Sequence, residues 1–493
     1  MENLFVKNAK YADWQKTHNF DNCKLARKGY GEFLTAYITG ENDGFVLNLN
    51  GSWGSGKTEF LKRLYSLLLT KHHPVIYIDA WESDFSKEPL TVVTSELLKQ
   101  LERFNQEIGA HSETQAVKEL CGKFLKGSLI GLAGIVSKTL VADAGIGVSI
   151  MQQLINEEPK SFLHKLSSDY EEQVNAIKEI RDALGLLAEV LESTFGAELP
   201  IVVLVDELDR CRPNYAIEML EVIKHFFKTD HFVFVVATDT DQLVHSISAI
   251  YGLNFDAPQY LKRFFDRKAN LPEPNIKNYI ESLGFCIESY DYVMLYPQAP
   301  YSTLKEFLDS TTSLLFYAYN LKIRDVDQLL HRLSSSLRYA IQIGLKTKKI
   351  QVINLPALVV GLIEHDMNFP SFHNRNDRVV EFTPAKNRQP KFLNWIQIDD
   401  YIKISMSGVV ITKIIEKEDN SVTEIDTVRS TKNTTQISLT TNRRVKCWSD
   451  EIDEKEYLYV HQNQIRDDSS KSQSKFWLWS DYKAVIELAG NIE

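Results

Sequence analysis

The feature that most constrains this chain is a glycine-rich loop between a strand pattern and a helix pattern. Residues 44–50 have the pattern of a short buried strand, and residues 58–70 carry apolar side chains at helical spacing. Glycines between two such elements let the backbone wrap around a phosphate with its N–H groups pointing inward. The loop matches G-x-x-x-x-G-K-[ST] and comprises Gly51, Ser52, Trp53, Gly54, Ser55, Gly56, Lys57 and Thr58.

This loop predicts a site for the phosphates of ATP or GTP and for magnesium. Lys57 contacts the outer phosphates in this prediction, and the Thr58 hydroxyl binds the metal. The following helix adds the positive end of its dipole, and we include Glu59 of its first turn among the nucleotide-binding residues. The alternative is a chance glycine-rich turn, which the flanking strand and helix disfavour.

A second acidic element follows another predicted strand. Residues 201–205 form a continuous run of β-branched and aliphatic side chains, which fits a strand buried on both faces of a parallel sheet. Asp206 and Glu207 come directly after it. We expect Asp206 to hold magnesium, mostly through water, and Glu207 to orient and deprotonate an attacking water. The alternative is that these acids only cap the helix that follows.

Two further acidic positions have open alternatives. Asp209 and Arg210 either form a local ion pair that shapes the site, or Arg210 reaches a neighbouring subunit. Asp239 follows the strand pattern of residues 232–237, together with Thr238. A polar residue there either points at the γ-phosphate or caps the next helix.

An arginine is expected to neutralise charge in the transition state. The candidates are Arg263 and Arg267 in one segment and Arg324 in another, and a surface or ion-pair role is the alternative for each. Asp79 and Glu82 follow the predicted strand at residues 75–78. They would lie on the edge where ligands bind in open α/β sheets, so a role near the site stays open for them.

Composition limits the class of protein. The 493 residues are 44% hydrophobic and 25% charged, as in ordinary globular proteins, and they suffice for two to four domains. A net charge of −10 argues against a generally cationic surface for nucleic acid or membranes. The five cysteines form no C-x-x-C pair, which fits free thiols in a reducing compartment and disfavours a zinc site. Without a signal-peptide pattern at residues 1–10, we expect a cytoplasmic protein.

These motifs resemble those of the KAP family of P-loop NTPases. The loop is GSWGSGKT, with the aromatic third position that this family favours, and residues 79–82 (DAWE) are similar to its N-A-W signature. Residues 205–211 (VDELDRC) are close to its D-D-L-D-R-C, and a long insertion with an apolar segment separates the two sites. Many family members carry two membrane helices in this insertion. Here residues 124–155 are interrupted by Lys138 and Asp143, so we do not expect spanning, while contact with a membrane stays open.

The resemblance covers residues 20–340 and implies an α/β fold with a parallel-sheet core of the ASCE type. An additional strand would lie between the loop strand and the acidic strand. The implied core comprises residues 1–89 and 196–270, with a helical insertion at 90–195 and a helical lid at 271–375. By position, Lys57, Thr58, Asp206 and Glu207 take the nucleotide and magnesium roles, and Arg324 resembles the basic residue of the lid.

The segment beyond the resemblance has the pattern of a β-rich C-terminal domain. Residues 376–493 contain several strand-like stretches separated by polar turns, among them residues 409–415. Trp477 and Trp479 alternate in a strand-like segment, where we expect them to form one buried face. Residue 402 begins another alternating stretch.

Two functions follow from the resemblance, and a third is disfavoured. The first is a magnesium-dependent ATPase that acts as a conformational or assembly switch, with ATP favoured over GTP, in a homo-oligomer and in bacterial anti-phage defence. The second is a nucleotide-dependent scaffold or sensor with negligible turnover, which recognises a partner protein through its C-terminal domain. Nucleic acid is not indicated, because no helix-turn-helix, zinc finger or aromatic-basic RNA motif is present in the sequence.

Overall fold

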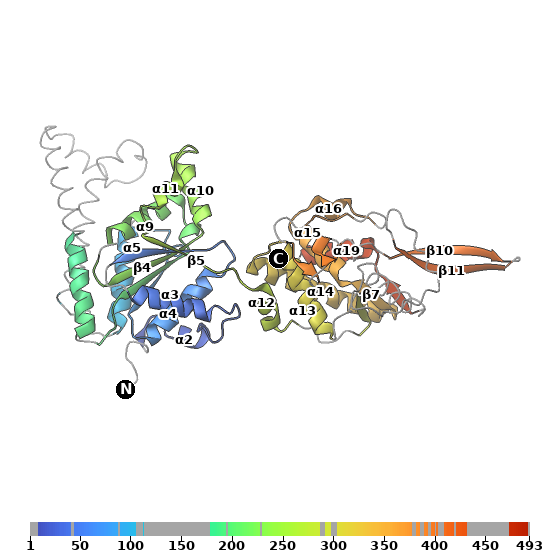
Figure 1. The fold of residues 1–493 in the computed structure, drawn as a ribbon, viewed down its shortest axis with the longest axis horizontal. Coiled ribbons are helices and arrows are strands. Elements are labelled where there is room, and N and C mark those ends of the chain that lie inside the picture. Colours follow the sequence, from blue (N-terminus) through green and yellow to red (C-terminus); the bar gives the residue numbers. More distant parts are fainter. Residues whose placement is uncertain are drawn as a thin grey trace, which may run out of the picture. The chain divides into compact units, whose positions relative to one another are not determined.

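A five-stranded parallel sheet organises residues 1–273, the first of two units into which the chain divides; the second is residues 274–493 (Figure 1). The structure is a computed structural model, and it describes residues 8–40, 44–86, 89–104, 112, 178–193, 196–226, 229–285, 291–296, 303–376, 381–384, 389–392, 396–399, 401–402, 409–418, 421–430 and 473–491.

The strands of the first sheet lie in the order β2-β3-β4-β1-β5, and every neighbouring pair is parallel. The expected additional strand between the loop strand and the acidic strand is β4. Four strands are where the sequence predicts them, and only the short β5 was not foreseen. Their bounds are β1 (Phe45–Asn50), β2 (Val75–Asp79), β3 (Ile201–Asp206), β4 (Phe232–Thr238) and β5 (Arg267–Asn270).

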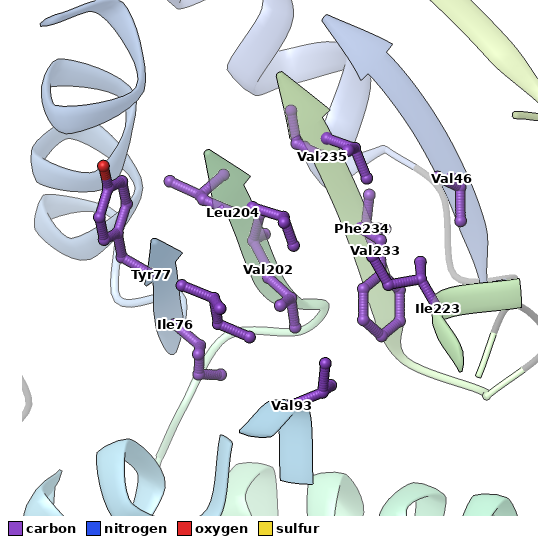
Figure 2. Packing of buried hydrophobic residues seen from close by; sticks show 14 of the residues in the cluster. Val46, Ile76, Tyr77, Val93, Val202, Leu204, Ile223, Val233, Phe234 and Val235 are labelled. Carbon is purple, nitrogen blue, oxygen red and sulfur yellow. The ribbon is translucent and has the colours of Figure 1, made fainter. Parts of the chain in front are cut away.

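Both faces of this sheet are covered, as its continuous apolar strands require. Helix α4 (Lys57–Thr70) contacts β2, β3 and β4, whereas α5 (Pro89–Phe104) contacts β2 and α9 (Pro213–Phe226). Figure 2 shows Ile223 of α9 beside Phe234 of β4, with Tyr77 pointing toward the opposite side. Every residue of β3 and β4 is buried, so the burial of apolar side chains on both faces fixes the sheet.

The remaining helices of the first unit extend these two layers. Residues 178–193 are also helical, but the predicted apolar segment at residues 124–155 lies outside the described residues. A cluster of aromatic rings, Tyr11, Trp14, Tyr65 and Tyr77, ties the N-terminal segment to α4 and β2. The other elements are α2 (Trp14–Thr17), α3 (Lys28–Thr39), the 3₁₀ turn η2 (Leu208–Arg210), α10 (Thr240–Tyr251) and α11 (Ala257–Leu261).

The second unit contains a small parallel sheet where the sequence predicted only helices up to about residue 365. Its strand order is β12-β7-β6, and β6 (Val293–Tyr296) and β7 (Ile350–Asn354) interrupt the helical series. The prediction was wrong at these strands because each is only four or five residues long. The helices are α12 (Ile276–Leu283), α13 (Leu304–Ala318), α14 (Ile323–Thr347), α15 (Leu355–Asp366) and α16 (Pro370–Asn374).

The C-terminal segment adds both strands and a helix to this unit. Strands β10 (Val409–Glu418) and β11 (Ser421–Ser430) form an antiparallel hairpin, and β8 (Lys391–Phe392) pairs with β9 (Ile396–Gln397). Strand β12 (Ser474–Phe476) pairs with β7, and α19 (Trp479–Gly490) packs on α14 and α15. The strand expected to begin at residue 402 is wrong there, since residues 401–402 are helical.

Trp477 and Trp479 are both buried, as predicted, but the expected strand is wrong. Strand β12 ends before Trp477, and α19 begins at Trp479. A side chain on Gly361 of α15 would lie 2.5 Å from Ile486 and 3.0 Å from the Trp479 ring. This close approach of two helices buries Trp479, whereas the expectation attributed its burial to one face of a sheet.

Among the residues that the structure describes, no helix has the length and apolarity needed to cross a bilayer.

Candidate functional site: the carboxyl edge of the large sheet

The register of the sheet brings the predicted site residues to one edge. Asp79 at the end of β2 lies opposite Asp206 at the end of β3, and Asn50 at the end of β1 lies opposite Thr238 of β4. The carboxyl ends of parallel strands are where open α/β sheets bind ligands. The glycine-rich loop leaves β1 at this edge, where the Gly51 N–H donates to the Thr238 carbonyl oxygen at 3.0 Å.

The loop backbone has the conformation that its glycines allow. Gly54 and Gly56 have φ angles of 72° and 85°, values that favour glycine. A Cβ atom on Gly51 would lie 2.8 Å from the Ser55 hydroxyl oxygen, so a side chain there would displace the loop. Gly56 is also the N-cap of α4 and offers no side-chain cap, so the first N–H groups of this helix remain suited to an anion.

Lys57 extends back across this loop. Its ammonium group donates to the Gly51 carbonyl oxygen at 2.9 Å and lies 3.4 Å from the Asp209 carboxylate. The side chain is 9% exposed. The cation is therefore held inside the curve of the loop, as a lysine that contacts phosphates must be.

Thr58 and the acidic residues after β3 meet beside Lys57. The Thr58 hydroxyl donates to Glu207 Oε1 at 2.9 Å, and it also interacts with Asp206. Burial raises the pKa of Asp206 to about 6, because the carboxylate loses solvation. Tyr77 of β2 donates its hydroxyl to Asp206 Oδ2 at 2.9 Å. Thr58 and Asp206, the two residues expected to hold magnesium, thus lie beside each other.

The turn η2 arranges three charged residues differently from the sequence prediction. Glu207 has a φ of 59°, in the left-handed region, and forms an ion pair with Arg210. Of the two alternatives for Asp209 and Arg210, the local ion pair is not formed, since Arg210 pairs with Glu207 and Asp209 with Lys57. Adjacent residues of a helical turn do not face each other, whereas residues three apart do. Arg210 also lies over the Trp81 ring, 5.9 Å from its centre.

Asp209 faces the loop and accepts three donors on one carboxylate oxygen. The Trp53 indole N–H lies 2.6 Å from Asp209 Oδ2, the Asp239 backbone N–H lies 3.2 Å away, and the Lys57 ammonium lies 3.4 Å away. Asp239 contacts the loop as well, since its Oδ2 accepts from the Trp53 backbone N–H at 2.9 Å. Its Oδ1 accepts from Gln242 N as the cap of α10, so Asp239 both caps a helix and touches the loop.

Arg27 supports the backbone of the loop, and no sequence pattern marked it as a site residue. Its guanidinium donates to the Ser55 carbonyl oxygen at 2.8 Å and to the Pro272 carbonyl oxygen at 2.6 Å. Burial lowers its pKa to about 10. Tyr77 was also missed, although its hydroxyl among the apolar residues of β2 that precede Asp79 was an available signal.

The predicted arginines lie on separate elements of the chain. Arg263 is exposed on the turn after α11, and the guanidinium of Arg267 lies over the Phe45 ring at the amino end of β1. Arg324 is exposed on α14 of the second unit. The Glu59 side chain pairs with Arg63 on α4, and its role at the nucleotide stays a prediction. The roles of Arg263 and Arg324 stay predictions.

The donor set fits magnesium and a phosphate chain. A hydroxyl and a carboxylate oxygen side by side, Thr58 and Asp206, are hard oxygen ligands of the kind that magnesium takes alongside phosphate oxygens. The loop supplies a cradle without side chains at Gly51, Gly54 and Gly56 and a buried ammonium at Lys57. Such an arrangement can bind a nucleotide and bring a water to Glu207.

Comparison with known proteins agrees with this geometry. The family model of the KAP family P-loop domain matches residues 27–289, more than half of the chain. The match begins at Arg27 and includes both the loop and the acidic turn.

Similar proteins extend this comparison. The phage T7 exclusion protein of Escherichia coli (strain K12) is 23% identical over 239 residues, which are 46% of this chain and 30% of that protein. The kinase D-interacting substrate of 220 kDa from Rattus norvegicus is 25% identical over 145 residues, 27% of this chain and 8% of that protein. The chain thus spans less than a third of the length of these relatives. Among solved structures, the Walker-type ATPase paby2304 of Pyrococcus abyssi aligns with a TM-score of 0.31 and 12% identity, over 83% of this chain and 95% of that one.

Proposed function

This chain belongs to the KAP family of P-loop NTPases, and we propose that it binds ATP with magnesium and hydrolyses it. The observation that carries the proposal is the meeting of Thr58, Asp206 and Glu207 beside the loop, with a 2.9 Å hydrogen bond from the Thr58 hydroxyl to Glu207. Hydrolysis of a phosphoanhydride needs positioning and charge stabilisation more than covalent chemistry. These residues and Lys57 supply both.

Each residue has a distinct task in this proposal. The loop N–H groups and the Lys57 ammonium bind the phosphates, and Thr58 and Asp206 hold magnesium, which neutralises phosphate charge. Glu207 accepts a proton from the attacking water; its carboxylate is within hydrogen-bond distance of the Thr58 hydroxyl, next to the metal position. We assign ATP over GTP because the family resemblance favours it and the sequence has no N-K-x-D base-reading motif.

Arginine assistance completes the proposed chemistry. Arg263 and Arg324 are exposed, so either can move toward a bound nucleotide or serve the site of a second copy of the chain. An exposed guanidinium of this kind stabilises transition-state charge only when nucleotide or assembly brings it to the phosphate. This dependence would make the protein a switch whose hydrolysis responds to its conformational or oligomeric state.

Phosphate release with ATP and magnesium tests the enzymatic proposal. We expect the full chain to release phosphate only with magnesium, and Glu207→Gln to lower kcat by about 10²–10⁴-fold, the usual contribution of a positioned base. Arg210→Gln is the matched control because it breaks the ion pair of Glu207 but leaves the carboxylate. Magnesium-independent release, or full activity in Glu207→Gln, would contradict the proposal.

Similarity to the phage T7 exclusion protein supports a role in anti-phage defence. In that role the nucleotide would control assembly, and solution mass measured with and without ATP and magnesium tests this directly. We expect a larger assembly with nucleotide for the wild type but not for Lys57→Ala. Equal masses in all four samples would exclude an assembly switch, and phage resistance of cells that express Lys57→Ala would exclude a nucleotide-dependent defence.

The β10–β11 hairpin favours a second candidate, a scaffold with negligible turnover that binds a partner protein. Its two strands pair along ten residues each, and Figure 1 shows it extending away from the helices of its own unit. A two-stranded hairpin has little stability of its own, so a partner that adds to it would order it further. Replacing residues 409–430 by a short Gly-Ser linker keeps β12 and α19 in place. Loss of the cellular phenotype with ATP hydrolysis retained supports recognition by the hairpin, and retention of both excludes it.

A further inference from the structure

The Asp209 carboxylate occupies the Lys57 ammonium, which is assigned to the phosphates, together with two N–H groups beside it. Its Oδ2 accepts from the Trp53 indole N–H at 2.6 Å, from the Asp239 backbone N–H at 3.2 Å and from the Lys57 ammonium at 3.4 Å. The side chain is 2% exposed, so solvent does not supply alternative donors. A cation and two N–H groups around one anionic oxygen form the same kind of surroundings that the loop offers to a phosphate oxygen.

A bound phosphate chain and this carboxylate compete for one cation. Lys57 is the described ammonium that extends into the curve of the loop, and it already lies against Asp209. Two anions at the same ammonium repel each other, and the repulsion is large where water is excluded. Phosphate binding therefore requires Asp209 to leave Lys57 or to remain nearby at a cost in affinity.

The other residues of the turn show the same pattern. Glu207, two residues before Asp209, accepts the Thr58 hydroxyl, which is the group assigned to magnesium. The turn thus engages both side chains of the loop that bind the ligand. Trp53 joins the loop to the turn through its indole, yet its ring is 50% exposed, so it can rotate away without leaving a cavity in the core.

We infer that Asp209 is an internal competitor of the nucleotide, which sets the affinity of the site by occupying Lys57 and Trp53 when no phosphate is bound. The inference rests on the proposed function, since it needs a nucleotide at this loop. It goes beyond that function by giving Asp209 and Trp53 a role. The turn η2 separates from the loop only when the phosphates of a ligand replace Asp209 at Lys57 and its magnesium replaces Glu207 at Thr58. The competitor raises the ligand concentration at which the site fills.

Affinity measurements on the full chain test the inference. A non-hydrolysable ATP analogue with magnesium is titrated by calorimetry, and tryptophan fluorescence is followed in parallel. Asp209→Asn removes the charge but keeps an oxygen acceptor for the indole, so we expect about tenfold tighter binding. Trp53→Phe removes the indole donor, so we expect tighter binding by about threefold and loss of most of the fluorescence change. Asp241→Asn, at an exposed position in the first turn of α10, removes an equal charge and should bind like the wild type.

The direction in which Asp209→Asn changes the affinity for the analogue shows whether Asp209 competes with the nucleotide or supports the loop. A residue that merely holds the loop in shape would weaken binding when replaced, so equal or weaker binding by Asp209→Asn overturns the inference while wild-type binding leaves the proposed function intact. Should Asp209→Asn fail to fold, Trp53→Phe decides alone: unchanged or weaker binding overturns the inference. If neither wild type nor variants bind the analogue, the proposed function falls and the inference falls with it.

Discussion

Two buried ion pairs, one in each unit, show how differently the same chemistry can be used. Lys57 and Asp209 in the first unit are 9% and 2% exposed, and Arg375 and Glu364 in the second are 3% and 0% exposed. The N–O separations are 3.4 Å and 2.6 Å. Both pairs carry a desolvation cost, but only in the second do the two charged groups themselves lie in short contact.

Glu364 is satisfied on both of its oxygens. Oε2 accepts from Arg375, and Oε1 accepts from the Ser371 hydroxyl at 2.6 Å and from the Thr383 backbone N–H at 2.9 Å. The guanidinium lies 4.1 Å from the centre of the Trp479 ring, so it also gains a cation–π contact. This pair joins three elements into one core: α15, α19 and the residue that follows α16.

Lys57 and Asp209 instead engage groups that a ligand can replace. Lys57 donates to a backbone carbonyl oxygen, and Asp209 accepts from the indole of the half-exposed Trp53 and from a backbone N–H. Burial does not by itself distinguish an ion pair that joins core segments from one at the proposed nucleotide site. What distinguishes them is whether the partners of the pair are core groups or groups of a ligand-binding loop.

Breaking the structural pair should give the largest effect on stability. Arg375→Met leaves the Glu364 carboxylate buried and unpaired, which should lower the free energy of unfolding of the second unit by about 3–5 kcal/mol. Urea unfolding followed by circular dichroism measures this change. Lys483→Met is the control, since its i,i+4 pair with Glu487 is 35% and 49% exposed and should contribute about 1 kcal/mol or less. A loss for Arg375→Met no larger than that of the control would contradict the comparison.

Breaking the ion pair of Lys57 and Asp209 should affect nucleotide binding more than folding. Lys57→Ala removes a cation that the phosphates use, which should weaken ATP affinity by roughly 10- to 100-fold, measured by calorimetry. Lys62→Ala, on the same helix but over the Trp14 ring, should bind normally. If Lys57→Ala instead unfolds the first unit with a loss comparable to that of Arg375→Met, the two pairs are not different in kind.

Asp206 is a third buried charge, and its burial in the folded protein disfavours the charged form of the carboxylate. Asp206→Asn should stabilise the ligand-free protein at pH 7 by about 1–2 kcal/mol, less than the ~3 kcal/mol that two pKa units represent, since asparagine accepts fewer hydrogen bonds. Burial raises the folded pKa to about 6, so the wild type binds its proton more readily when folded. The advantage of the variant should therefore shrink as pH falls from 7 toward 4, as thermal melts can measure. An advantage that grows on acidification would oppose this account.

Tyr77 should have the smallest effect of the four. Tyr77→Phe removes the hydroxyl that donates to Asp206 Oδ2, which should cost about 1 kcal/mol of stability and raise the magnesium concentration needed for half-maximal ATP binding. Tyr65→Phe, in the same aromatic cluster but without that contact to Asp206, is the control. Equal magnesium requirements for the two variants would remove Tyr77 from the site.

The loop, the long strands and the acidic pair could be predicted because each depends on local sequence. A run such as residues 201–205 is apolar at every position, so its burial does not depend on the partner strand. Asp206 and Glu207 follow from where that run ends. The short strands β5, β6 and β7 have four or five residues each, too few for a period to distinguish strand from helix.

Contacts across the chain could not be predicted from the same patterns. Arg27 reaches the Pro272 carbonyl oxygen over 245 positions of sequence, and no local signal marks it. Asp209 turns toward Lys57 because Glu207 adopts a left-handed backbone before the 3₁₀ turn, which redirects the side chains that follow. The burial of Trp479 depends on Gly361 of another helix. Each of these features is set by packing between distant segments.

The nucleotide that stays bound after incubation with ATP and magnesium tests hydrolysis at this site most directly. Full-length wild type and Glu207→Gln are incubated with labelled ATP, freed of unbound ligand by rapid filtration, and their bound nucleotide is separated by chromatography. We expect mostly ADP on the wild type and mostly ATP on Glu207→Gln, with neither on Lys57→Ala. Intact ATP on the wild type and on Glu207→Gln in equal amounts would show that the site binds nucleotide without hydrolysing it.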